Sequence, residues 1–166
     1  MALEMDTFGT IARVALVGVG ATAVMDAWLA ALGRFGVKGL DFALLGRWTG
    51  HLARGRIAHA AIAKASPVPG ERAIGWVAHY AVGVAFAGLL VALAGVDWIG
   101  RPSPAPALAF GAASVAAPLL VMQPAMGAGV AASRTAAPLR NVLRSLVNHT
   151  VFGAGLYLAA RLVAIA

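Results

Sequence analysis

Long apolar stretches alternate with short polar segments along the chain. A membrane-spanning helix needs about 20 consecutive, mostly apolar residues. Four stretches meet this requirement, at about residues 8–32, 73–95, 105–127 and 138–164, and the second and third contain no Lys, Arg, Asp or Glu. The pattern predicts an all-α fold in which residues 1–166 form a single membrane domain, a four-transmembrane-helix bundle.

The connection at residues 35–72 is too long for a bare loop in so compact a chain. Four apolar residues recur at helical spacing in its first half: Leu44, Leu45, Trp48 and Leu52. The other face carries Arg47, His51 and Arg54. This pattern favours a short amphipathic helix at the membrane surface, broken by Gly50 and Gly55. A second short helix, which carries His59, is expected over residues 56–65.

Two further patterns concern the inside of the bundle. Pro118 and Pro124 lie within the third stretch, and each is expected to bend the helix because proline removes a backbone hydrogen bond. Small residues line up with polar ones at intervals of four: Gly18 and Thr22 with Asp26, and Gly75 and Gly83 with His79. Since helices in lipid associate where small residues let backbones approach, these polar side chains should face the bundle interior.

Composition agrees with a membrane protein. Hydrophobic residues make up 61% of the chain and charged residues 11%, with a mean hydropathy of +0.84, whereas a soluble domain has about 25% charged residues. A soluble domain and a disordered chain are both excluded, since disorder needs low hydrophobicity. With no cysteine, disulfides and thiolate metal sites are excluded too.

The net charge of +7 is explained by topology. Four spans put both termini on one side, which holds Arg13, Arg101 and Arg161. The other side holds ten basic residues: Arg34, Lys38, Arg47, Arg54, Arg56, Lys64, Arg72, Arg134, Arg140 and Arg144. The positive-inside rule therefore places the second side in the cytoplasm and both termini outside, after an N-terminal tail with Glu4 and Asp6. The lipid bilayer is the expected partner, and no nucleic acid is expected.

Four strongly polar residues lie deep in the predicted spans, one in each: Asp26, His79, Gln123 and His149. At about 1.5 Å per helical residue, they lie roughly 12, 10, 16 and 13 Å from Arg34, Arg72, Arg134 and Arg140, respectively. Such residues are functional candidates because their burial in lipid is costly. The shared depth predicts one buried polar site that opens toward the cytoplasm.

Other polar residues extend this site. Tyr80 and Asn148 neighbour two of the deep residues, and six residues of the cytoplasmic segments are expected to fold over the opening: Arg47, His51, His59, Glu71, Ser133 and Arg134. Structural interpretations stand beside the functional one. Asp26 can form an ion pair with Arg47, Arg134 or a histidine, Gln123 can bond a carbonyl freed by Pro124, and His51 and His59 can be ordinary interfacial histidines.

Three functions fit this arrangement. His79 and His149 can ligate a haem iron, or with Asp26 a divalent metal, although no short metal-binding motif is present. The site can instead bind or transport a small molecule, with a homo-oligomer supplying the helices that one chain lacks. In the third interpretation the polar core is purely structural, in an accessory subunit.

Five segments resemble those of the bacterial inner-membrane family called domain of unknown function 2938. They are residues 20–26 (GATAVMD), 46–51 (GRWTGH), 69–80 (PGERAIGWVAHY), 122–127 (MQPAMG) and 132–135 (ASRT). The resemblance extends from about residue 15 to 160. It implies a four-helix protein of a bacterial inner membrane and implies no activity.

Overall fold

The computed structural model describes residues 7–37 and 39–165. The chain is 78% helical, and none of the described residues forms a strand. Four helical segments are long and apolar enough to cross a membrane: α1 (Thr7–Arg34), α3 (Glu71–Ala94), the segment Pro104–Met126 and α7 (Pro138–Ile165). The all-α, four-span prediction is confirmed, and every predicted boundary lies within two residues of the observed one.

The third spanning segment is not one regular α-helix. It consists of α5 (Pro104–Ser114), a π-helical stretch η2 (Ala117–Met122) and α6 (Gln123–Met126). Within η2, the backbone N–H of Gln123 donates to the carbonyl oxygen of Pro118, five residues earlier. Pro118 itself has no N–H to donate, so the irregularity expected at the prolines takes the form of a widened turn.

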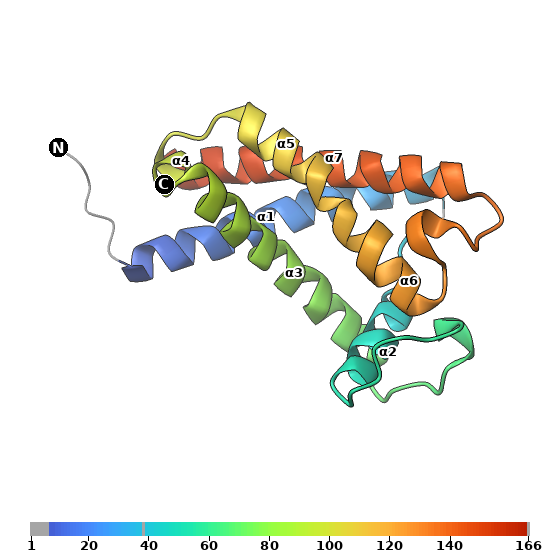
Figure 1. The fold of residues 1–166 in the computed structure, drawn as a ribbon. Helices are drawn as coiled ribbons and strands as arrows, with labels where there is room; N and C mark the ends of the chain where they lie inside the picture. The colour runs from blue at the N-terminus through green and yellow to red at the C-terminus, as the bar shows by residue number, and fades with distance from the viewer. Residues whose placement is uncertain (1–6, 38, 166) are drawn as a thin grey trace.

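Helix α1 lies between α3 and α7, and α5 packs against the other side of α7 (Figure 1). Helices α3 and α5 are joined by α4 (Asp97–Gly100) but make few contacts with each other. The start of α1, the end of α7 and α4 lie at one end of the bundle, and α2 (Phe42–Leu52) lies at the other, packed against α3. The remaining elements are the short 3-10 turns η1 (Ile62–Lys64) and η3 (Val130–Ala132).

Glycines bring the helices into backbone contact. A Cβ atom on Gly18 of α1 would lie 2.5 Å from the Cα atom of Val84 on α3, and one on Gly111 of α5 would lie 2.5 Å from the Cα atom of Gly153 on α7. A Cβ on Gly75 of α3 would overlap the carbonyl oxygen of Phe42 on α2. The predicted role of small residues in helix association is thus seen at three helix pairs.

The outward faces are as apolar as the core. Between 17% and 33% of the residues in each apolar spanning window are buried. Large apolar side chains therefore point outward from every span, among them Phe8, Leu16, Val77, Leu93, Val121, Leu158 and Leu162. A water-soluble protein rarely exposes so much apolar surface. This surface is compatible with a multi-pass membrane protein.

Two predictions for the connection between α1 and α3 are wrong. Gly50 does not break the first helix, because α2 continues to Leu52 and the left-handed turn comes at Gly55, with φ +78°. The second helix expected over 56–65 is absent from the described residues apart from η1, and His59 lies in a stretch without regular secondary structure. Lys38, Glu4 and Asp6, which entered the charge argument, lie outside the described residues.

Replacing Gly18 by alanine is expected to destabilise the protein. Its Cβ would meet backbone atoms of Gly83 and Val84, which cannot move aside unless α1 and α3 separate, and overpacking of this kind costs about 1–3 kcal/mol. The measurement is the thermal unfolding midpoint of the detergent-solubilised protein. The matched control is Gly33→Ala on the same helix, where no atom lies within 4 Å and the midpoint should stay or rise. Equal midpoints for the two variants would contradict the close contact.

Candidate functional site

Helices α1 and α3 share a polar centre made of Asp26, His79 and Tyr80, here called the Asp26 centre. The Oδ1 atom of Asp26 lies 2.9 Å from Nε2 of His79, and Oδ2 accepts a hydrogen bond of 2.9 Å from the hydroxyl of Tyr80. The side chains of His79 and Asp26 are 9% and 19% exposed. Two of the four deep polar residues predicted to meet are therefore in direct contact, and the ion-pair partner of Asp26 is a histidine rather than Arg47 or Arg134.

The small residues beside this centre explain why it forms. Thr22 donates its hydroxyl proton to the carbonyl oxygen of Gly18 at 2.8 Å, one turn earlier on α1. A Cβ on Gly83 would overlap the Oγ1 atom of Thr22. Because Gly83 has no side chain, α3 lies close to α1 at this point. His79 and Tyr80, about one turn before Gly83 on α3, can therefore reach the carboxylate of Asp26.

An aromatic wall borders the Asp26 centre. The rings of Phe42 and Trp76 are stacked with centroids 3.9 Å apart, and the ring of Phe42 meets that of His79 edge to face at 5.2 Å. The centroid of Trp76 lies 6.2 Å from that of Tyr80. Trp76 is 38% exposed, so the wall reaches the protein surface. A carboxylate beside aromatic faces is a suitable environment for a cation.

Arg47 and Glu71 form a separate clamp at the start of α3. The Nε and NH2 groups of Arg47 donate to the two carboxylate oxygens of Glu71 at 2.9 and 2.8 Å, and NH1 donates to the carbonyls of Ala63 and Ala65. The hydrogen bonds to Glu71 raise the pKa of the Arg47 guanidinium, against the opposing effect of partial burial. Arg47 and Glu71, which were predicted to fold over the opening of the polar site, instead link α2, η1 and α3.

His51 and His59 form a third group, and their expected place at the surface is wrong. Each is 6% exposed. Nδ1 of His51 lies 2.8 Å from Nε2 of His59, and the backbone N–H of His59 donates to the carbonyl oxygen of Ala125 on α6 at 2.8 Å. The pair therefore holds the irregular stretch around His59 against both α2 and α6.

His149 lies on a different seam, between α5 and α7. Its Nδ1 atom is 2.8 Å from the hydroxyl of Ser114, which donates to the carbonyl oxygen of Gly111 at 2.7 Å. A serine hydroxyl has only one proton, so the Nδ1 atom of His149 supplies the proton of their shared bond. The neighbouring Asn148 accepts a bond of 3.1 Å from the indole N–H of Trp28 on α1.

The prediction that four deep residues share one level is wrong for Gln123. His149 is level with Ser114, and Gln123 follows Ser114 by nine residues, which is more than about 10 Å along a helix. The Oε1 atom of Gln123 is buried and has no hydrogen-bond partner among the residues that the structure describes. Ser133 and Arg134 are exposed in the turn after η3. Where one polar site was expected, the described residues form several small groups.

The proposed metal ligands are not brought together. Asp26 and His79 are adjacent, but His149 bonds to Ser114 on another pair of helices. Within residues 7–37 and 39–165, no group of three or more His, Cys, Asp or Glu side chains is placed to hold a metal ion. The observed arrangement thus offers neither the three-residue metal site nor the histidine pair expected for a haem.

Three contributors were missed in the sequence. Trp76 stands three and four residues before His79 and Tyr80, a spacing that places it on the same helix face. Phe42 lies on α2, and no sequence pattern indicated that its ring would contact His79. Ser114 lies on α5 and is bonded to His149, a contact that the count of residues along the spans did not predict.

The sequence model of a family described as "Protein of unknown function (DUF2938)" matches residues 15–163. This match confirms the resemblance seen in the five segments. No curated protein and no solved structure matches the chain.

The docking of the His59 stretch is expected to weaken at acidic pH. Burial lowers the pKa of the His59 imidazole below its ordinary 6.5, and the positive charge of Arg56 and the neighbouring His51 lower it further. The folded state then binds fewer protons than the unfolded state, so stability rises with pH and is lost as the pH falls from about 6.5 through the lowered pKa. Amide hydrogen exchange over residues 56–61 should accelerate between pH 7.5 and 5, after correction for intrinsic rates.

His59→Gln is the control for this prediction, because glutamine fills a similar space but does not titrate. Exchange in His59→Gln should be less dependent on pH than in the unaltered protein. An identical pH dependence in both proteins would show that another group controls the docking.

Proposed function

We propose that this chain, which belongs to the DUF2938 family, is a multi-pass protein of a bacterial inner membrane with both termini outside, and that its Asp26 centre binds a small organic cation. The ligand class is a protonated amine or quaternary ammonium group. The observation that carries the proposal is the carboxylate of Asp26, held between His79 and Tyr80 beside an aromatic wall.

The carboxylate retains acceptor capacity. An ionised carboxylate offers about four lone-pair directions, and each oxygen of Asp26 accepts one of the two bonds described. Because the surrounding helices and lipid have a low dielectric constant, an opposite charge brought to this carboxylate is attracted more strongly than it would be in water.

The aromatic wall supports a cation as the ligand. A cation over the face of Trp or Tyr gains about 0.5–2 kcal/mol, with the larger values at desolvated sites. Tyr80 donates to the carboxylate and its ring lies 6.2 Å from that of Trp76, and the partial exposure of Trp76 provides an approach. An anion is less well served, because the guanidinium of Arg47 is engaged by Glu71 and backbone carbonyls.

Asp26→Asn is expected to weaken cation binding at least about tenfold, equivalent to about 1.4 kcal/mol, because the amide keeps the shape of the side chain and removes its charge. The probe is benzyltrimethylammonium chloride, titrated calorimetrically into detergent-purified protein. Asp41→Asn is the matched control, since Asp41 is an exposed N-cap of α2 and asparagine caps equally well. Its affinity should equal that of the unaltered protein.

Two results would overturn the cation site. One is absence of measurable heat with the unaltered protein at millimolar probe. The other is an Asp26→Asn variant that loses thermal stability but binds the probe as tightly as the Asp41→Asn control. The second result would assign the Asp26 centre to folding alone, as in an accessory subunit.

The proposed orientation predicts the activity of reporter fusions. Alkaline phosphatase, which is active only outside the cytoplasm, should be active when fused after residue 166 and inactive when inserted at Gly55, because ten of thirteen basic residues are assigned to the side that contains Gly55. A fluorescent protein that folds only in the cytoplasm should give the reverse pattern. Phosphatase activity at Gly55 together with fluorescence at the C-terminus would reverse the proposed orientation.

A further inference from the structure

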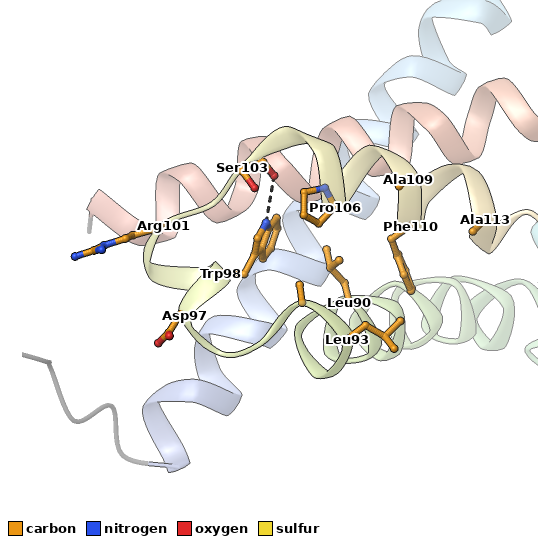
Figure 2. A pocket seen from close by; sticks show the side chains of 11 residues that line it. Leu90, Leu93, Asp97, Trp98, Arg101, Ser103, Pro106, Ala109, Phe110 and Ala113 are labelled. Atoms are coloured by element: carbon orange, nitrogen blue, oxygen red, sulfur yellow. Dashed lines mark hydrogen bonds between the residues drawn. The ribbon is translucent and has the colours of Figure 1, made fainter.

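A groove runs between α3 and α5 (Figure 2), at the end of the bundle that lies opposite α2 in Figure 1. It exists because α3 and α5 are connected through α4 yet make few direct contacts. Its volume is about 700 Å³, within the range of about 300–1,000 Å³ typical of ligand pockets. The groove lies far along α3 from the Asp26 centre, since Leu90 follows His79 by eleven residues.

The walls of the groove are apolar. Leu90 and Leu93 of α3 face Phe110 of α5 across it, and Pro106 and Ala109 continue the α5 side (Figure 2). The ring of Phe110 packs edge to face against Phe86 of α3, with centroids 5.9 Å apart, and so closes the inner side. A flexible hydrocarbon chain suits such a surface, because the walls of the groove offer no polar partner along their length and a hydrocarbon chain needs none.

One end of the groove is polar. The indole N–H of Trp98 donates to the carbonyl oxygen of Ser103 at 3.2 Å, which fixes α4 against the start of α5. Asp97 and Arg101 lie beyond Trp98 and are exposed (Figure 2). Neither forms an ion pair with another side chain in the part of the chain that the structure describes. One negatively and one positively charged side chain therefore lie at the same end of an apolar groove.

We propose that this groove seats one acyl chain of a zwitterionic glycerophospholipid, with the ammonium of its headgroup at Asp97 and its phosphate at Arg101. The two charges complement the two charges of such a headgroup. The mouth lies where α3 ends and α5 begins, which is the headgroup level if these segments span a bilayer, and tryptophan favours that level. The inference rests on the membrane placement made under the proposed function and is independent of the Asp26 centre.

The test uses full-length protein reconstituted into vesicles of equal parts phosphatidylethanolamine and phosphatidylglycerol. The protein is extracted in mild detergent, and the lipids it retains are counted by native mass spectrometry. The unaltered protein should retain one phosphatidylethanolamine. Ala109→Trp, which fills the groove from an exposed position, should reduce that retention at least fivefold. Leu108→Trp is the matched control, since Leu108 is 39% exposed and is not part of the groove lining.

A second variant tests the proposed contacts of Asp97 and Arg101 with the lipid headgroup. Asp97→Asn combined with Arg101→Gln should abolish the preference for phosphatidylethanolamine over phosphatidylglycerol, while Arg13→Gln, on the same side of the bundle, should preserve it. Equal lipid retention by the two tryptophan variants would overturn the site. A dimer that Ala109→Trp dissociates would also overturn it, since the groove would then be covered by a second copy.

Flotation of the vesicles separates this inference from the membrane placement. If the protein floats with the vesicles and resists alkaline extraction but retains no phosphatidylethanolamine, the lipid site fails and the membrane placement stands. If the protein is released by alkaline extraction, the membrane placement itself fails and the lipid site fails with it.

Discussion

Close backbone contact between helices is the constraint on which the rest of this structure depends. Apolar side chains cover both the inside and the outside of the bundle, so burial of apolar area does not by itself determine which helix faces contact one another. Glycines determine these contacts at Gly18, Gly83, Gly111 and Gly153, where an added Cβ would overlap atoms of the facing helix. These contacts set how far apart the helices lie, and that separation decides which polar side chains can reach a partner.

The spans could be predicted from sequence because the avoidance of water is a property of each segment alone. Their partners could not, because lateral order is a property of the whole bundle. Counting residues placed Asp26, His79 and His149 at similar depth, and the first two do meet. However, α1 separates α3 from α7, and His149 turns to Ser114 on α5. Depth is therefore necessary for two polar residues to meet, and it is not sufficient.

The connection between α1 and α3 shows a second limit of sequence reasoning. The periodicity of α2 was correct, but its polar face was expected to meet water. Gly46 and Gly75 instead let α2 lie directly on α3, which leaves room for the rest of the segment to fold back against α6. His51 and His59 become buried as a consequence. A two-residue contact between glycines thus changed the environment of histidines several residues away, an effect that no local pattern encodes.

The two polar seams of the bundle differ in a way that bears on their roles. On the α5–α7 seam, the hydroxyl of Ser114 both donates and accepts, and Nδ1 of His149 is satisfied within the protein. On the α1–α3 seam, each oxygen of Asp26 accepts one bond and the side chain is still 19% exposed, next to an aromatic wall that reaches the surface. A charged carboxylate in surroundings of low dielectric constant is costly unless it is fully paired. The partial exposure of the Asp26 carboxylate beside the aromatic wall is the feature on which the proposed cation site rests.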